Sequence, residues 1–515
     1  MYTFLLDNSS PLTPPADFYL RPADDGQNAF AGMILPRQQP PVHPPAGKGD
    51  DFDECEQNHE PYTLEFIVEN DKLLWNEVPL MQLVEQYGTP LKLTYLPKIS
   101  EQIQQAKSMF KSAMKRHNYR SKYTYCYPTK SSHFRFVLDE VLRNRVHLET
   151  SSTVDITIVE DLYRRGKISR STYVVCNGNK QHQYTDRICE LLENGFNVIP
   201  VLDSPRELGA YASLDNDTIN IGIRVATDEP PGLSFRTSRL GVRYSEISTL
   251  YRTRIQNDTK FRLKMLHFFV DSGVRDSPYY WSEFSCFVYK YCELRKICVD
   301  LDSINIGGGL PIARSLNFSY DYEAIIDRII ELIASVCARH NVPVPHLFTE
   351  FGSYTVGESG AAIYEVTEQK QQNAKEAWCM IDGSFITQLP DTWATQQDFV
   401  CLPLNNWSSP QRKVMLGGMT CDSKDYYPTS DNISGVNLPE FDEDEQKQYV
   451  GLFHTGAYQE ALGGYGGISH CLIPTPKHVL IDSNGKGGWT SHVFAPEQES
   501  GDMLRYLGYS SASNI

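Results

Sequence analysis

Short apolar segments alternate with longer amphipathic ones through the middle of this sequence. Eight apolar segments are rich in β-branched and aromatic residues, which predicts strands over 123–130, 146–150, 172–177, 196–202, 218–226, 264–271, 301–306 and 346–350. Stretches with helical patterns, or long insertions, separate most of them. Eight such alternations predict an α/β fold, a parallel (β/α)8 barrel of the TIM type. A doubly wound open sheet has the same alternation and is the alternative.

The pattern differs on both sides of this region. Before it, residues 62–68 alternate like a strand, and the following segments indicate a short amphipathic helix over 78–87, a strand over 91–95 and a helix over 103–118. After residue 350, turns separate short strand patterns over 361–366, 378–381, 414–417 and 450–453. These short strands predict a second domain made of β-structure.

We therefore expect four regions along the chain. They are a proline-rich, partly disordered arm over 1–60, strands over 61–95 that join the β-domain, the barrel over 96–350, and a C-terminal β-domain over 351–515 with a polar surface insertion at 429–448. The chain of 515 residues is too long for a single core, which agrees with two folded domains.

Composition narrows the class of protein. The net charge of −16 argues against a nucleic-acid or acidic-membrane partner, because both repel an acidic surface. There is no apolar run long enough to span a bilayer and no secretory leader pattern, which predicts a cytoplasmic protein. The 12 cysteines show no CxxC pairs or regular spacing, so we expect reduced thiols and no metal site.

A lysine follows the first predicted barrel strand. Lys130 closes the segment Tyr-Thr-Tyr-Cys-Tyr-Pro-Thr over 123–129, at the strand end where barrels carry their chemistry. Desolvation lowers the pKa of a lysine, and a neutral amine can form a Schiff base with an aldehyde cofactor. The alternative is a lysine that merely extends from a strand end into solvent.

Glycines and a carboxylate end the last two predicted barrel strands. Gly307, Gly308 and Gly309 would let backbone N–H groups approach a phosphate, or would simply form a tight turn. Glu350 can hold a pyridine nitrogen protonated, which makes the ring an electron sink. An ion pair with an arginine such as Arg224 is the other role open to this glutamate.

Two motifs in the predicted β-domain also carry reactive groups. Cys421 can deliver a proton and Asp422 can bind a cation, although a lone cysteine is usually a small apolar residue. Tyr458, in Gly-Ala-Tyr, can place its phenol on a phosphate or stand in a β-turn.

Taken together and in order, these motifs resemble the fold-type III, pyridoxal-phosphate-dependent basic amino acid decarboxylases, whose barrel is shared with alanine racemase. Within that family the chain is most similar to the biosynthetic arginine decarboxylases. The resemblance covers roughly residues 60 to 480, and its closer matches are 175–180 (Val-Cys-Asn-Gly-Asn-Lys), 389–394 (Leu-Pro-Asp-Thr-Trp-Ala), 420–423 (Thr-Cys-Asp-Ser) and 456–463 (Gly-Ala-Tyr-Gln-Glu-Ala-Leu-Gly).

The resemblance implies a role for each matching residue. Lys130 would be the Schiff-base lysine, and Glu350 would contact the pyridine nitrogen. Cys421 would protonate the substrate carbon after carbon dioxide leaves, and Asp422 would contact the substrate. The remaining cofactor ligands would be Ser272, Gly307, Gly308, Gly309, Tyr458, Phe269 and Arg224. In the family Cys421 and Asp422 reach the partner subunit's site, which implies a homodimer with shared active sites.

Three positions depart from the family pattern. Relatives have His-x-Gly-Ser where this chain has Phe269, Asp271 and Ser272, so a phenylalanine replaces the histidine that stacks on the cofactor. Phenylalanine can stack but cannot hydrogen-bond or carry charge. Many relatives also have a phosphate-binding arginine where this chain has Ser353. Both changes predict weaker cofactor binding, and they favour a non-catalytic homologue that binds partners as a second class of function.

Substrate choice depends on Asp391. In relatives an aspartate in this context lies near the far end of the substrate, where a carboxylate suits a distal cation and would repel the second carboxylate of diaminopimelate. Arginine is expected from the resemblance, giving agmatine and carbon dioxide in polyamine biosynthesis. Ornithine, lysine, diaminopimelate and carboxynorspermidine remain alternatives, as does an N-cap role for Asp391 at a helix starting at Thr392. A racemase would need a tyrosine where this chain has Cys421.

Overall fold

The computed structural model describes residues 65–215, 218–228, 236–429 and 435–509. The arm predicted over 1–60 lies outside these residues, as do the first positions of the strand predicted over 62–68. Among the described residues, no helix has both the length and the apolar composition needed to cross a membrane.

Eight parallel strands form a closed barrel. They run in the order β9 (Ile219–Ala226), β11 (Phe261–His267), β12 (Ser303–Asn305), β13 (His346–Thr349), β5 (Tyr123–Pro128), β6 (His147–Thr150), β7 (Val174–Cys176) and β8 (Val198–Leu202). The pairing of Val201 with Gly222 joins β8 back to β9 and closes the ring. This closure confirms the predicted barrel and excludes the open sheet. A short strand, β10 (Val242–Arg243), pairs with β9.

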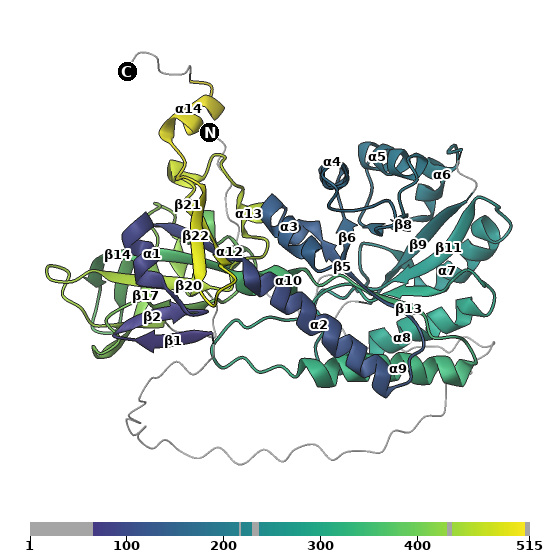
Figure 1. The fold of residues 1–515 in the computed structure, drawn as a ribbon, viewed down its shortest axis with the longest axis horizontal. Helices are drawn as coiled ribbons and strands as arrows, with labels where there is room; N and C mark the ends of the chain where they lie inside the picture. The colour runs from purple at the N-terminus through teal and green to yellow at the C-terminus, as the bar shows by residue number, and fades with distance from the viewer. Residues whose placement is uncertain (1–64, 216–217, 229–235, 430–434, 510–515) are drawn as a thin grey trace, which may run out of the picture. The chain divides into compact units, whose positions relative to one another are not determined.

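Helices cover the outside of the barrel (Figure 1). They are α2 (Leu96–Arg116), α3 (Arg135–Arg143), α4 (Thr153–Arg164), α5 (His182–Glu193), α6 (Leu208–Tyr211), α7 (Tyr244–Leu250), α8 (Pro278–Arg295), α9 (Tyr322–His340) and α10 (Gly352–Val356). Figure 1 shows α8 and α9 side by side. Helix α2 starts seven residues before its predicted start at 103, because Leu96 and Ile99 also belong to its buried face.

Side chains of the barrel strands alternate between two apolar environments. In β5, Tyr125 and Tyr127 belong to the large core between strands and helices, whereas Cys126 belongs to a smaller cluster with Val175, Ile199, Val201, Met265 and Phe348. Because successive strand residues point to opposite faces, the smaller cluster fills the inside of the barrel. The barrel is therefore a packed core, and its chemistry lies at the strand ends.

A mixed sheet forms the second domain. Its main path runs β18 (Tyr426–Tyr427), β17 (Gln411–Gly417), β15 (Ala377–Ile381), β14 (Gly360–Gln371), β4 (Leu91–Tyr95), β21 (Lys477–Ser483) and β22 (Trp489–Ala495). Strands β16 (Val400–Pro403), β19 (Val436–Pro439) and β20 (Gln448–Phe453) pair beside this path. Strand β4 lies between β14 and β21, so a segment from before the barrel is built into this sheet.

Smaller elements complete the domain. Strands β1 (Phe66–Glu69), β2 (Lys72–Trp75) and β3 (Val78–Pro79) form a separate sheet, and the helices are α1 (Leu80–Tyr87), α11 (Phe385–Gln388), α12 (Asp391–Ala394), α13 (Gln459–Gly463) and α14 (Ser500–Tyr506). The prediction of a polar insertion over 429–448 is wrong for β19, because Val436 and Leu438 are buried and the strand pairs with β17. The acidic residues 442–445 are exposed.

Candidate active site

A cavity of about 600 Å³ opens at the carboxyl ends of the barrel strands. The strands and the turns that follow them place polar side chains around it, as expected for this barrel face. Of the residues predicted from sequence to act in the site, those that line it are Lys130, Arg224, Phe269, Gly308, Gly309, Glu350 and Tyr458. These seven residues come from six separate parts of the sequence and meet at one place.

Lys130 follows β5 in a single turn of 3-10 helix and reaches into this cavity. Its Nζ donates to Oε2 of Glu149, a fully buried carboxylate on β6. Burial alone would lower the pKa of Lys130, but the Glu149, Glu350 and Tyr458 side chains raise it above the usual range. The expected lowering of the pKa of Lys130 is thus wrong for the chain without cofactor, because the amine lies against the buried Glu149 carboxylate.

Glu149 was not predicted from the sequence. Burial raises its pKa, the Lys130 ammonium lowers it and Glu350 raises it again, with a net upward direction. Its other oxygen, Oε1, accepts a hydrogen bond of 3.0 Å from Asn177. A charged residue within an otherwise buried barrel strand is the signal that could have identified it.

Glu350 lies just past β13 and is surrounded by donors. Its carboxylate accepts hydrogen bonds from Asn305 Nδ2 at 2.6 Å and Asn177 Nδ2 at 3.0 Å, and it lies 3.1 Å from Nε2 of His267. Burial would raise the pKa of Glu350, but His267, Lys130 and Asn177 together lower it to about 2. The carboxylate therefore stays ionised, and its partner in the cavity is His267 rather than Arg224.

The glycine turn after β12 leaves no room for side chains. A Cβ atom on Gly307 would lie 2.5 Å from the carbonyl oxygen of Phe268, and one on Gly308 would lie 2.4 Å from that of Glu350. Gly307 and Gly309 also have positive φ values of 68° and 91°. Glycine is thus required by backbone approach and by conformation, and the turn brings its backbone to the cavity wall.

Several buried polar atoms at this end of the barrel have no protein partner. Among the described residues they include Ser272 Oγ, Arg224 Nε, His267 Nδ1 and Asn177 Oδ1. Buried polar groups are normally hydrogen-bonded, so such a set indicates a polar ligand. The polar atoms of this set and the Arg224 guanidinium fit the phosphate and ring substituents of pyridoxal phosphate.

Phe269 lies beyond the end of β11 and lines the cavity. The guanidinium carbon of Arg224 lies 5.4 Å from the centroid of its ring. Asp271 and Ser353, the other two departures from the family pattern, also line the cavity. Arg239, which sequence analysis did not single out, lies there too and adds a second guanidinium group.

Tyr458 comes from the β-domain. Its backbone N–H donates to the carbonyl oxygen of Ser131 at 2.9 Å, and Ser131 Oγ donates to the phenol oxygen at 3.2 Å. Its φ value of 67° is unusual for a residue other than glycine. These contacts tie the tyrosine to the turn that carries Lys130.

Cys421, Asp422 and Asp391 do not line the cavity of their own chain. Cys421 is exposed in the loop between β17 and β18, and the neighbouring Cys471 sulphur raises its pKa. A raised pKa keeps this thiol protonated at neutral pH. Asp422 lies 3.6 Å from Nε2 of His470.

Asp391 is buried at the start of α12. Its Oδ2 accepts a hydrogen bond of 2.8 Å from Gln459 Nε2, and its Oδ1 accepts one of 3.2 Å from Thr395 Oγ1. Helix α12 begins at Asp391 itself, and the carboxylate does not cap it, so the N-cap alternative is wrong. Burial lowers the pKa of Arg314 to about 10, and the Asp391 carboxylate counteracts part of that shift.

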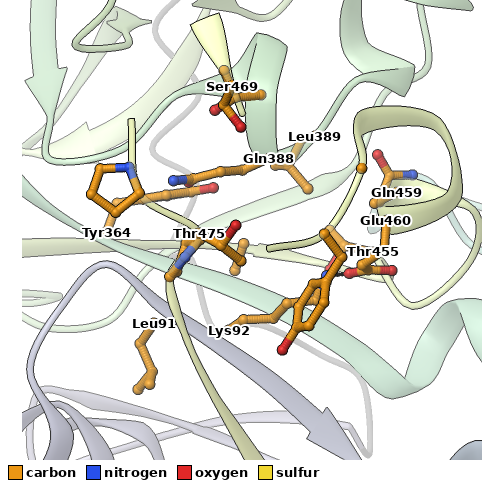
Figure 2. Close-up of a pocket in the computed structure, with 16 residues that line it drawn as sticks. Leu91, Lys92, Tyr364, Gln388, Leu389, Thr455, Gln459, Glu460, Ser469 and Thr475 are labelled. Carbon is orange, nitrogen blue, oxygen red and sulfur yellow. Dashed lines mark ion pairs between the residues drawn. The ribbon is translucent and has the colours of Figure 1, made fainter. Parts of the chain in front are cut away.

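A second, smaller cavity lies in the β-domain, separate from the one that contains Lys130. Figure 2 shows Lys92 from β4 on one side, with Gln459 and Glu460 from α13 opposite. Lys92 and Glu460 form an ion pair. Gln459 connects this cavity to Asp391, since its side chain donates to that carboxylate.

Comparisons with known proteins agree with this geometry. Residues 97–357 match the family model described as "Pyridoxal-dependent decarboxylase, pyridoxal binding domain". The chain is 24% identical to a biosynthetic arginine decarboxylase of Geobacter sp., over 82% of this chain and 84% of that protein. It is 22% identical to arginine decarboxylase 2 of Arabidopsis thaliana, over 81% of this chain and 73% of that protein.

Solved structures show the same fold. A biosynthetic arginine decarboxylase from Campylobacter jejuni superposes with a TM-score of 0.73 at 20% identity, covering 86% of this chain and 89% of that one. A diaminopimelate decarboxylase from M. jannaschii superposes with a TM-score of 0.67 at 16% identity, covering 87% of this chain and 97% of that one. The match of the pyridoxal-binding domain, which spans the barrel and the strand ends that carry Lys130, Glu350 and the glycine turn, places this chain in the family of fold-type III, pyridoxal-phosphate-dependent decarboxylases of basic amino acids.

Proposed function

We propose that this chain decarboxylates L-arginine to agmatine and carbon dioxide, as a homodimer in which each active site uses residues of both subunits. The observation that carries the proposal is the meeting of Lys130, Glu350 and the glycine turn in one cavity at the barrel mouth. The arginine decarboxylases among its relatives support the choice of substrate.

The cofactor supplies an electron sink for the pair of electrons that carbon dioxide leaves on the substrate. Lys130 would hold the cofactor covalently, and Glu350 would hold a proton at the pyridine nitrogen. The low pKa of Glu350, about 2, keeps this carboxylate charged, so it attracts that proton throughout the neutral range. Glu149 lies against Lys130 Nζ and, by raising its pKa, holds the amine as an ammonium in the cofactor-free chain.

The phosphate would lie against the glycine turn. Ser272 Oγ has no protein partner, and Arg224 and Arg239 supply positive charge at the same end of the barrel. These two arginines make up for the absence of the family's arginine at Ser353. Phe269 would contact a face of the ring by stacking, without the hydrogen bond that a histidine offers.

The acid that protonates the substrate carbon would come from the partner subunit. Cys421 keeps its proton at neutral pH, as its raised pKa indicates, and it does not line its own chain's cavity. The retained proton suits an acid, and the position outside its own chain's cavity suits a thiol that acts in the other subunit of a dimer. Asp422, next to it, would contact the substrate.

The test is carbon dioxide release by the purified protein, loaded with pyridoxal phosphate, from arginine, ornithine, lysine and diaminopimelate in parallel. The proposal predicts the fastest release from arginine. Preference for ornithine or lysine would support decarboxylation of a basic amino acid but would show that arginine is not the preferred substrate. Preference for diaminopimelate would reject the assignment of Asp391 as the residue that binds a distal cation. If cofactor-loaded protein releases carbon dioxide from none of the four, the result would support the non-catalytic homologue that Phe269 and Ser353 favour.

A further inference from the structure

Three potential metal ligands meet on the surface of the β-domain, away from the cavity that contains Lys130. Cys421 lies in the loop between β17 and β18, and His470 and Cys471 lie in a turn of 3-10 helix, His470–Leu472, about fifty residues later. One ligand atom from each residue, two Sγ atoms and an imidazole nitrogen, lies within 4.8 Å of both others, and all three side chains are exposed.

The spacing of these atoms suits a tetrahedral cation. The two Sγ atoms are 3.4 Å apart. Zinc binds thiolate sulphur at about 2.3 Å and imidazole nitrogen at about 2.0–2.1 Å, which sets neighbouring ligand atoms roughly 3.5–3.8 Å apart in a tetrahedron. The two sulphurs therefore need only a small movement to share one ion.

A fourth ligand is available beside the cluster. Oδ2 of Asp422 lies 3.6 Å from Nε2 of His470, and Asp422 is half-buried. Either this carboxylate or a water molecule can complete the coordination, as in zinc sites with three protein ligands. The ligand set of two thiolates and one imidazole selects a borderline-soft cation of the zinc class over magnesium or calcium.

The turn that carries two of the ligands has an unusual backbone. Cys471 and Leu472 have φ values of 55° and 54°, two consecutive non-glycine residues in the left-handed region. Residues stay in this region only where surrounding structure imposes it, and such positions gather at functional sites.

We propose that Cys421, His470 and Cys471 form a binding site for zinc, and that zinc bound there silences the decarboxylase by occupying the thiol of Cys421. The inhibitory part rests on the proposed function, in which Cys421 donates a proton. The metal site itself rests only on the geometry of the three ligands. A thiolate bound to zinc has given up its proton, so it cannot deliver one to the substrate carbon.

The binding test uses the cofactor-loaded protein, reduced and freed of metal, with zinc supplied against a chromophoric chelator. We expect about one zinc per chain, and replacement by cobalt should give the intense thiolate-to-cobalt absorbance of a tetrahedral site. C471S and H470A should each weaken binding by roughly a hundredfold or more, since loss of an outer-shell partner alone costs about 10–100-fold. C286S, which alters an exposed cysteine on α8, is the matched control and should bind normally.

The inhibition test measures carbon dioxide release from arginine with and without zinc. Wild-type and C286S protein should lose activity with zinc and regain it with a chelator, whereas C471S should keep its activity. Normal zinc affinity in both C471S and H470A would overturn the site. Normal binding without inhibition would overturn the inhibitory role. Should the protein release carbon dioxide from no amino acid, the cobalt spectrum still decides the metal site on its own. Wild-type protein that binds no zinc after reduction would also refute the metal site.

Discussion

The Nε2 atom of His267 lies 3.1 Å from Oε2 of Glu350, within the cavity that also contains Lys130. Two asparagines, Asn177 and Asn305, donate to the same carboxylate. The cluster fixes the orientation of Glu350 and stabilises its charge, which is the state required to hold a proton on a pyridine nitrogen.

Replacing Glu350 by glutamine should therefore slow the reaction much more than it weakens substrate binding. The amide has the same shape but carries no charge, so the electron sink is lost while the cavity is kept. We expect kcat to fall by about two to three orders of magnitude, with KM for arginine changed by less than about tenfold. Steady-state kinetics at saturating cofactor measure both values. A rise in KM with an unchanged kcat would assign Glu350 to binding alone.

Replacing Glu149 by glutamine should change the pH dependence of cofactor attachment. The Glu149 carboxylate raises the pKa of Lys130, so at a given pH less of the amine is neutral and attachment is slower. Without that charge, burial lowers the lysine pKa, and attachment should be faster at neutral pH. The midpoint, the pH at which the attachment rate is half-maximal, should fall by about one unit or more. The visible absorbance of the bound cofactor measures this rate.

The same experiment has an internal control. E140Q alters a carboxylate on α3 that hydrogen-bonds Ser100, outside the cavity, and should leave the midpoint unchanged. An upward shift, or none, in Glu149→Gln would show that Glu149 does not set the protonation of Lys130.

Mixing two inactive variants should restore activity if the site is shared between subunits. In a two-fold dimer of Lys130→Ala with Cys421→Ala chains, one of the two sites keeps both residues. Random pairing at equal amounts places such mixed dimers at about half of the total, so recovery should reach about a quarter of wild-type activity. If subunits demonstrably exchange and activity does not return, Cys421 does not act across the dimer.

Asp391 should determine the preference for a distal cation. A charge-assisted hydrogen bond to a guanidinium contributes about 1.5–3 kcal/mol, which corresponds to about one to two orders of magnitude in specificity. Asp391→Asn should raise KM for arginine by that factor and leave KM for citrulline, its uncharged analogue, nearly unchanged. Equal losses for both would indicate that Asp391 only supports the local fold, through Gln459 and Thr395.

Particular residues show how far the sequence can predict this molecule. The eight barrel strands could be located because β-branched and aromatic residues cluster between helical patterns. Closure of the ring could not, because it depends on the pairing of Val201 with Gly222, which no local pattern encodes. Strand β19 is not predicted from the sequence, because its buried residues Val436, Leu438 and Pro439 lie in an otherwise polar stretch.

In the active site, too, the sequence predicts some features and not others. The positions of Lys130, Glu350 and the glycine turn at strand ends could be predicted, since each ends a predicted barrel strand. The protonation of Lys130 could not, because its partner Glu149 is 19 residues away and becomes a neighbour only when β5 pairs with β6. Likewise Cys471 is 50 residues from Cys421, so no spacing pattern revealed the contact between their sulphurs.

The most direct test of the account is to find where the cofactor attaches and whether turnover depends on that attachment. Protein loaded with pyridoxal phosphate is reduced with borohydride and digested, and the labelled peptide is identified by mass spectrometry, while carbon dioxide release from arginine is measured for wild type and Lys130→Ala. We predict the label on Lys130 and loss of both label and turnover in the variant. A label on another lysine, or turnover of arginine by Lys130→Ala at the wild-type rate, would contradict the account.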